Sequence, residues 1–115
     1  MPESFQIDEQ VGDGTRTILR VRGHLNAATT GQLLNHARSI RTRGQGLVLN
    51  LSQVSFIASS GVGALLALGE EYREVGLEVC YAELSSVVDS VIKLLNLDSF
   101  LTIAATEEEA LRRAA

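Results

Sequence analysis

The 115-residue sequence contains one cysteine, one proline and no tryptophan, and aromatic residues make up 4% of it. The single cysteine excludes a disulfide framework and a zinc site built from several thiolates. No apolar run approaches the roughly 18 residues of a membrane span, and residues 1–4 lack the basic-then-apolar order of a signal peptide. We therefore expect a soluble, cytoplasmic protein with no direct membrane insertion.

Acidic side chains are missing from a long central stretch. No Asp or Glu occurs between Asp13 and Glu70, whereas six arginines fall there. The net charge of −4 hides this division, because residues 1–58 carry six basic and four acidic side chains and residues 59–115 carry four basic and ten acidic ones. A negative total with so few aromatic residues argues against a nucleic-acid surface.

The hydrophobic patterns predict one α/β domain over residues 1–115. Two alternating segments flank the turn sequence Gly12-Asp13-Gly14, which is typical of an N-terminal hairpin. The nearly continuous apolar run 47–51 predicts a central strand, and residues 52–58 are expected to connect it to a helix. Two further strands are expected at 77–83 and 100–103.

Helical patterns alternate with these strands. They are expected to begin after Asn26, at Ser59, at Ser85 or Ser86, and at Thr106, where three acidic residues follow a capping threonine. In the second helix the spacing predicts a buried stripe, made of Val62, Leu65, Leu66, Gly69 and Tyr72. The fold class is therefore α/β, with a mixed sheet of about five strands, opened by a hairpin and packed with about four helices.

The sequence contains no complete motif for catalysis or metal binding. Gly61-Val62-Gly63 lacks the following Gly-Lys-Ser or Gly-Lys-Thr of a phosphate loop, and the two serines before it do not lie in Gly-x-Ser-x-Gly. His24 is the one plausible base for a serine nucleophile, and no acidic residue accompanies it in the acid-free stretch. His24 and His36 have no carboxylate or cysteine at ligand spacing. We expect no enzyme activity, no cofactor and no metal.

The pair Ser59-Ser60 has two interpretations. In the structural one, a serine caps the following helix by accepting a hydrogen bond from a backbone N–H two or three residues on. In the functional one, the exposed hydroxyl is phosphorylated. A phosphate there meets free N–H groups and the positive end of the helix dipole, so it adds about −1.5 to −2 charge without unfolding the helix. On a docking surface, that charge acts as a switch.

Three stretches carry a resemblance to a known family: Gly23–Asn26 followed by a helix, the strand Leu47–Ser52, and Phe56–Gly63 leading into a second helix. Over essentially its whole length the chain resembles the STAS domain of bacterial anti-sigma factor antagonists. The resemblance implies a non-catalytic module that binds an anti-sigma factor, which is also a serine kinase, and thereby releases a sigma factor. Phosphorylation ends the binding, and a serine phosphatase resets it.

By position, the resemblance puts the phosphoacceptor on Ser59, with Ser60 as second choice. The partner surface that it implies comprises His24, Asn26, Ala27, Ala28, Ala58, Ser59, Ser60, Gly61 and Val62. The family commonly has an aspartate before the acceptor serine and another at the end of the first loop, where this chain has Ala58 and Asn26. These departures leave two outcomes open: the chain still switches with a partner of altered charge, or it is a STAS interaction module that does not switch, such as a signalling scaffold or a lipid-transporter subunit. A further alternative is a sensor of a nucleotide or small ligand, with the helix start cradling phosphate.

Overall fold

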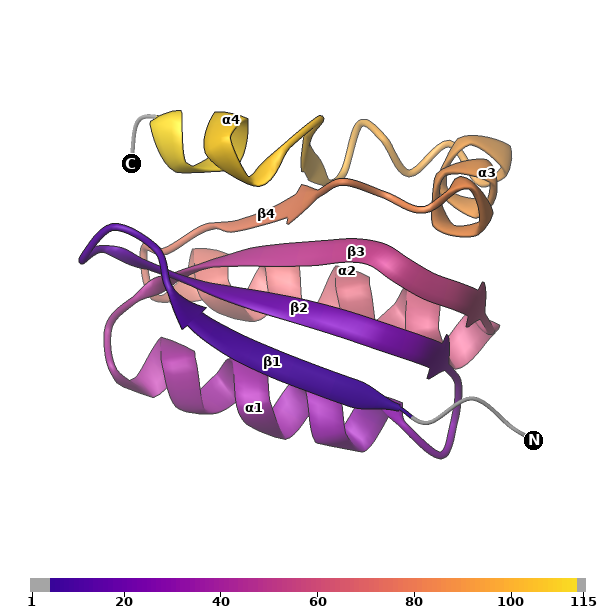
Figure 1. Ribbon diagram of the computed structural model, residues 1–115, viewed down its shortest axis with the longest axis horizontal. Helices are drawn as coiled ribbons and strands as arrows, with labels where there is room; N and C mark the ends of the chain where they lie inside the picture. Colours follow the sequence, from indigo (N-terminus) through magenta and orange to yellow (C-terminus); the bar gives the residue numbers. More distant parts are fainter. Residues whose placement is uncertain (1–4, 114–115) are drawn as a thin grey trace.

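A mixed five-stranded sheet runs through the centre of the computed structural model, which describes residues 5–113 (Figure 1). The strand order is β1-β2-β3-β4-β5; β1 pairs with β2 in the antiparallel direction, and the later pairs are parallel. The strands are β1 Gln6–Val11, β2 Arg16–Leu25, β3 Gly46–Ile57, β4 Val79–Ala82 and β5 Thr102–Ala104. The helices are α1 Thr30–Thr42, α2 Ser59–Glu74, α3 Ser86–Leu94 and α4 Glu107–Arg112. The predicted fold class is confirmed.

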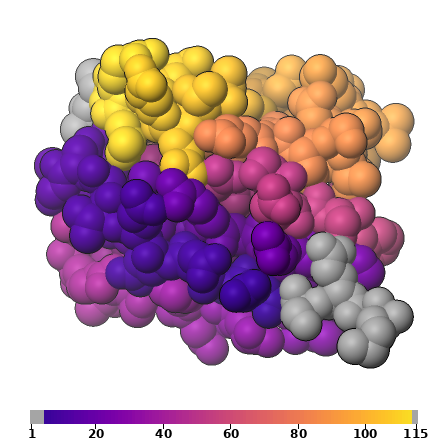
Figure 2. Space-filling model, in the orientation of Figure 1, coloured from indigo at the N-terminus to yellow at the C-terminus, as the bar shows by residue number. Residues whose placement is uncertain are grey.

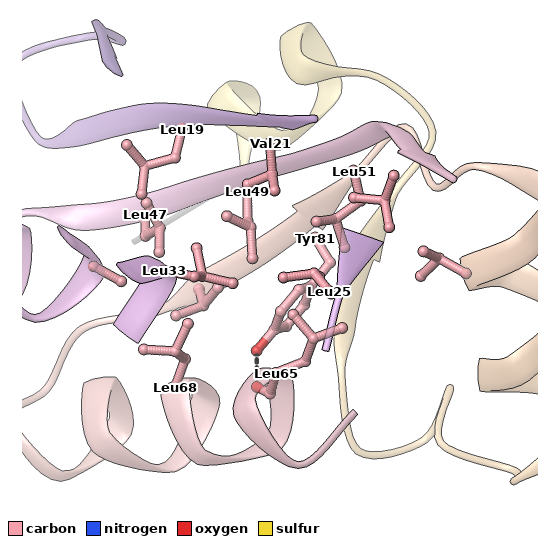
Figure 3. Packing of buried hydrophobic residues seen from close by; sticks show 14 of the residues in the cluster. Leu19, Val21, Leu25, Leu33, Leu47, Leu49, Leu51, Leu65, Leu68 and Tyr81 are labelled. Atoms are coloured by element: carbon pink, nitrogen blue, oxygen red, sulfur yellow. Dashed lines mark hydrogen bonds between the residues drawn. The ribbon is translucent and has the colours of Figure 1, made fainter. Parts of the chain in front are cut away.

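The larger core lies on the face of the sheet that α1 and α2 cover (Figure 3). Leu49 and Tyr81 of the sheet contact Leu65 and Leu68 there, and the Tyr81 hydroxyl donates to the Leu65 carbonyl oxygen. Burial raises the pKa of Tyr81. The predicted stripe on α2 was partly wrong, because Leu68 is fully buried whereas Val62, Leu66 and Gly69 are half-buried. The helix is rotated so that Gly61 and Ala64 also lie in the contact.

The central strand is longer than its apolar run. Residues 52–58 were expected to form a connection, but β3 continues to Ile57 because β2 runs beside it to Leu25. Val54 and Ile57 are buried, and the polar side chains between Leu51 and Val54 are exposed. The strand therefore delivers its last residues directly to the start of α2.

The smaller core lies on the opposite face, beneath α4. Ile18, Val48 and Cys80 are buried there against Ala110, and burial raises the pKa of the Cys80 thiol to about 11. In the space-filling view the yellow atoms of the C-terminal segment lie directly against the indigo and violet atoms of the hairpin (Figure 2). The chain thus covers part of this second face with its last helix.

Polar contacts at both ends of α4 hold it on the sheet. At its start, Arg20 donates to both Glu107 carboxylate oxygens at 2.8 and 2.7 Å, and the buried Asn50 amide donates to one of them at 2.6 Å. At its end, the buried Arg16 guanidinium donates to the carbonyl oxygens of Leu111 and Arg113 at 2.9 and 2.7 Å. The carbonyls that end a helix lack intrahelical partners, so Arg16 satisfies two of them.

Glu107→Ala is expected to lower the free energy of unfolding by about 2 kcal/mol at neutral pH, because the buried Asn50 amide loses its acceptor. The hydrogen bonds from Arg20, and to a lesser extent from Asn50, lower the pKa of Glu107 below its ordinary value of 4.5. This stabilisation is therefore complete above pH 4.5 and is lost as the pH falls through the lowered pKa. Denaturant unfolding between pH 7 and 3 measures it. Glu107→Gln keeps the shape and removes the titration, and a wild-type acid dependence in that variant would contradict the assignment.

Candidate functional site

The ends of β2 and β3 bring the two predicted partner-binding segments together. Leu25 and Ile57 are opposite each other in the parallel pair, and the Ala58 N–H donates to the Leu25 carbonyl oxygen at 2.8 Å. The loop 26–29 then leads into α1, and Ala58 leads into α2, at the same end of the molecule (Figure 1). The carboxyl ends of neighbouring parallel strands are where binding sites form in α/β sheets.

Gly61 sets how closely α2 approaches this edge. A Cβ added at Gly61 would lie 2.8 Å from both the Leu25 carbonyl oxygen and the Ile57 Cγ1 atom. These distances are too short for a side chain, so only glycine lets the first turn of α2 lie directly on the strand ends. Gly61 was predicted to face a partner. Because it is buried, it positions the surface residues around it and does not itself form part of the exposed surface.

Ser59 and Ser60 are the first two residues of α2, and both are exposed. The interpretation of a serine as the helix cap is wrong. The cap position is Ala58, whose backbone is extended (φ −91°, ψ 172°) and whose side chain accepts no hydrogen bond. The first helical bond runs from the Val62 N–H to the Ala58 carbonyl oxygen at 3.1 Å. Within residues 5–113, neither serine hydroxyl makes a hydrogen bond.

The loop before α1 is ordered by its own polar side chains. The Asn26 side-chain oxygen accepts the Ala28 N–H at 2.9 Å, and the Thr29 hydroxyl accepts the Asn26 N–H at 3.0 Å while donating to the His24 carbonyl oxygen at 2.6 Å. Ala27 and Ala28 are exposed at the tip. Asn26 therefore closes a local turn, as a carboxylate at that position also would, without the negative charge.

Phe56 is a surface residue that sequence reasoning did not place among the partner-binding residues. It lies opposite His24 in the β2–β3 pair, with its ring centroid 5.5 Å from that of the imidazole, and its side chain is 48% exposed. An exposed phenylalanine next to small and polar side chains is a typical anchor for a protein partner. The signal in the sequence was a large aromatic residue between Ser55 and the buried Ile57.

The arginines of the acid-free stretch do not gather at this site. Arg38 and Arg41 bind Glu71 at 2.7 and 3.0 Å, and Arg43 binds Glu9 at 2.9 Å. These pairs join α1 to α2 and to β1. Hydrogen bonding by Arg38 lowers the pKa of Glu71. Acidic residues from outside the stretch thus neutralise Arg38, Arg41 and Arg43 away from the site.

Among the residues that the structure describes, no three His, Cys, Asp or Glu side chains are placed to hold a metal ion. Over the same residues, no helix has the length and hydropathy required to cross a membrane. The site therefore offers two exposed hydroxyls at a helix start, a short turn and one aromatic ring.

A mixed five-stranded sheet with this order of four helices defines a small α/β domain. The family model of the STAS domain matches residues 5–110, so the chain belongs to the STAS domain family. An anti-sigma factor antagonist from Mycobacterium paratuberculosis has the same fold, with a TM-score of 0.80 and 24% identity over 98% of each chain. The unphosphorylated antagonist SpoIIAA has a TM-score of 0.73 and 23% identity over 95% of each chain. These likenesses show the shared fold.

A curated relative extends the comparison beyond the antagonists. Osmosensory protein A of Mycobacterium tuberculosis is 28% identical over 75 residues, which are 65% of this chain and 48% of that protein. The chain therefore spans about half the length of the curated relative that it matches.

Proposed function

We propose that the protein is an anti-sigma factor antagonist of the bacterial cytoplasm that acts by binding and not by catalysis, with residues 1–115 as a single STAS domain. Its surface of His24, 26–28, 58–60 and Val62 binds an anti-sigma factor that is also a serine kinase, and this binding releases a sigma factor. Phosphorylation of Ser59 ends the binding, and a serine phosphatase restores it. The observation that carries the proposal is the exposed hydroxyl of Ser59, unbonded within residues 5–113, at the first position of α2 beside the ordered loop.

The helix start suits a phosphorylated residue. The first N–H groups of α2 have no acceptor within the helix, and the dipole of a 16-residue helix is positive at this end. A phosphate on Ser59 satisfies these groups without disturbing the fold and adds about −1.5 to −2 charge to a surface that has none. SpoIIAA has been solved in a phosphorylated form as well as an unphosphorylated one, which supports the proposal by analogy.

The phosphorylation site is tested with the purified protein, each purified anti-sigma factor kinase of the source organism and ATP, followed by mass spectrometry of the peptides. We expect one phosphate per chain on Ser59, none in Ser59→Ala, and normal incorporation in the matched variant Ser60→Ala. Transfer to Ser60 alone would move the site by one residue. Absence of phosphate from both serines, while the same kinase phosphorylates another antagonist, would contradict the switch.

A STAS interaction module that does not switch is the second candidate. It is favoured by Ala58 and Asn26, which leave the site without carboxylates, and by the longer relative in which the domain is only a part. Such a module, a signalling scaffold or a transporter subunit, would bind its partner equally well as wild type and as Ser59→Asp. Equal affinities of these two proteins for a partner isolated with the wild type would therefore favour it.

A further inference from the structure

Charged side chains are distributed unevenly along the molecule. The end that contains the β1–β2 turn carries the ion pairs of Arg38 and Arg41 with Glu71 and of Arg113 with Glu78. At the opposite end, residues 26–28, 52–62 and 85–87 include no Asp, Glu, Lys or Arg. We name these three segments the neutral surface. The ends of β2 and β3 and the starts of α2 and α3 lie together there (Figure 1).

The neutral surface is continuous from α2 to α3. Beyond Asn50, β3 has no partner in β4, and its residues 52–55 line a shallow depression of about 370 Å³ together with residues 85–87. The Ser85 N–H donates to the Leu51 carbonyl oxygen at 3.3 Å, which fixes the start of α3 beside the strand. This depression therefore extends the predicted partner surface along the end of β3 to the start of α3.

Apolar, hydroxyl and amide groups make up the exposed part of this surface. Phe56 is 48% exposed and Val87 is 38% exposed, and exposed serines lie beside each of them at the starts of α2 and α3. Covering such groups costs little desolvation compared with covering charges. The centres of stable protein interfaces have this composition, depleted of charge and rich in aromatic side chains.

We infer that the whole neutral surface is one docking site and that its occupant is an uncharged face of the anti-sigma factor. This inference rests on the proposed function and specifies the chemistry of the partner. The complex forms through apolar contact around Phe56 and Val87 and through hydrogen bonds to serine hydroxyls, without ion pairs. A phosphate on Ser59 then opposes binding because it must be desolvated against a neutral partner, not because it meets an acidic one.

Salt dependence separates this mode of docking from an electrostatic one, because exposed ion pairs are screened at high ionic strength. We expect the Kd for the purified anti-sigma factor kinase to change less than about threefold between about 50 mM and about 500 mM NaCl. Arg22, whose strand neighbour is Gln53, is one charge next to the surface, and Asp89 in the first turn of α3, paired with Lys93, is another. Arg22→Gln removes the contribution of Arg22 to any residual slope. A weakening of about tenfold or more with salt in wild type and in Arg22→Gln would overturn the inference.

The extension to α3 is tested with Ser86→Glu. A carboxylate in the first turn of α3 stabilises that helix, so the variant is expected to fold. Its Kd should rise by about tenfold or more, because the charge must be desolvated on binding. The matched control Ser39→Glu, on the far part of α1, should bind like wild type. Unchanged binding by Ser86→Glu would overturn the extension.

If the wild type binds no anti-sigma factor kinase at any salt concentration, the proposed function fails and this inference with it.

Discussion

Ser59→Asp is expected to weaken binding to the anti-sigma factor by about 30-fold or more, equivalent to about 2 kcal/mol. The new carboxylate lies on an exposed helix start within an uncharged surface, so the partner would have to desolvate it without supplying a counter-charge. Isothermal titration calorimetry with the purified partner measures the effect. An acidic residue in the first turn stabilises α2, so the variant is expected to unfold at or above the wild-type temperature.

Ser59→Ala is the matched control for this charge effect. The serine hydroxyl makes no hydrogen bond within residues 5–113, so its removal leaves the fold unchanged, and binding is expected to stay within about threefold of wild type. A loss of binding in the alanine variant as large as in the aspartate variant would mean that the hydroxyl itself is the contact. In that case charge would not be the basis of the switch.

Gly61→Ala is expected to lower the free energy of unfolding by about 2 kcal/mol and the Tm by about 10 °C. The added methyl group would lie 2.8 Å from the Leu25 carbonyl oxygen, which belongs to a paired strand and cannot move aside cheaply. The first turn of α2 must therefore shift away from the sheet. Thermal and denaturant unfolding measure the loss, and the shift also displaces Ser59.

Gly63→Ala, two residues later in α2, is expected to change the stability in the opposite direction. No atom lies within 4 Å of a Cβ added there, and the residue is exposed within the helix. The substitution is therefore expected to raise the free energy of unfolding by about 0.5–1 kcal/mol, the ordinary gain for glycine to alanine in a helix. If Gly61→Ala were as stable as Gly63→Ala, the close approach of α2 to β2 would not be a constraint on the fold.

Local patterns in the sequence predicted the order of elements well, because each amphipathic segment has one face that must be buried. The length of β3 could not be predicted in this way. Ser52, Gln53 and Ser55 are typical of a loop, and they lie in a strand because β2 pairs with that segment from a distant part of the chain. The serine cap failed for a similar reason: the bond from the Ala58 N–H to the Leu25 carbonyl oxygen makes Ala58 the cap residue, so that the helix begins at Ser59 itself.

The acid-free stretch could be identified from the sequence, but the acidic partners of its arginines could not. The α1 arginines of this stretch have no acidic residue near them in the sequence. Arg38 and Arg41 instead bind Glu71, which is about 30 residues further along the chain. Only the packing of α1 against α2 brings these groups together. The same tertiary arrangement joins Phe56, the loop 26–28 and the start of α3, whose common surface no single segment reveals.

Cys80 is an internal probe of local and global unfolding, and it is present in every variant described above. The thiol is 2% exposed beneath α4, and its pKa of about 11 leaves little of the reactive thiolate at neutral pH. A thiol reagent in solution therefore modifies Cys80 only in molecules in which α4 has detached or the chain has unfolded. The labelling rate reports the free energy of that event, and because the chain has one cysteine the signal has a single source.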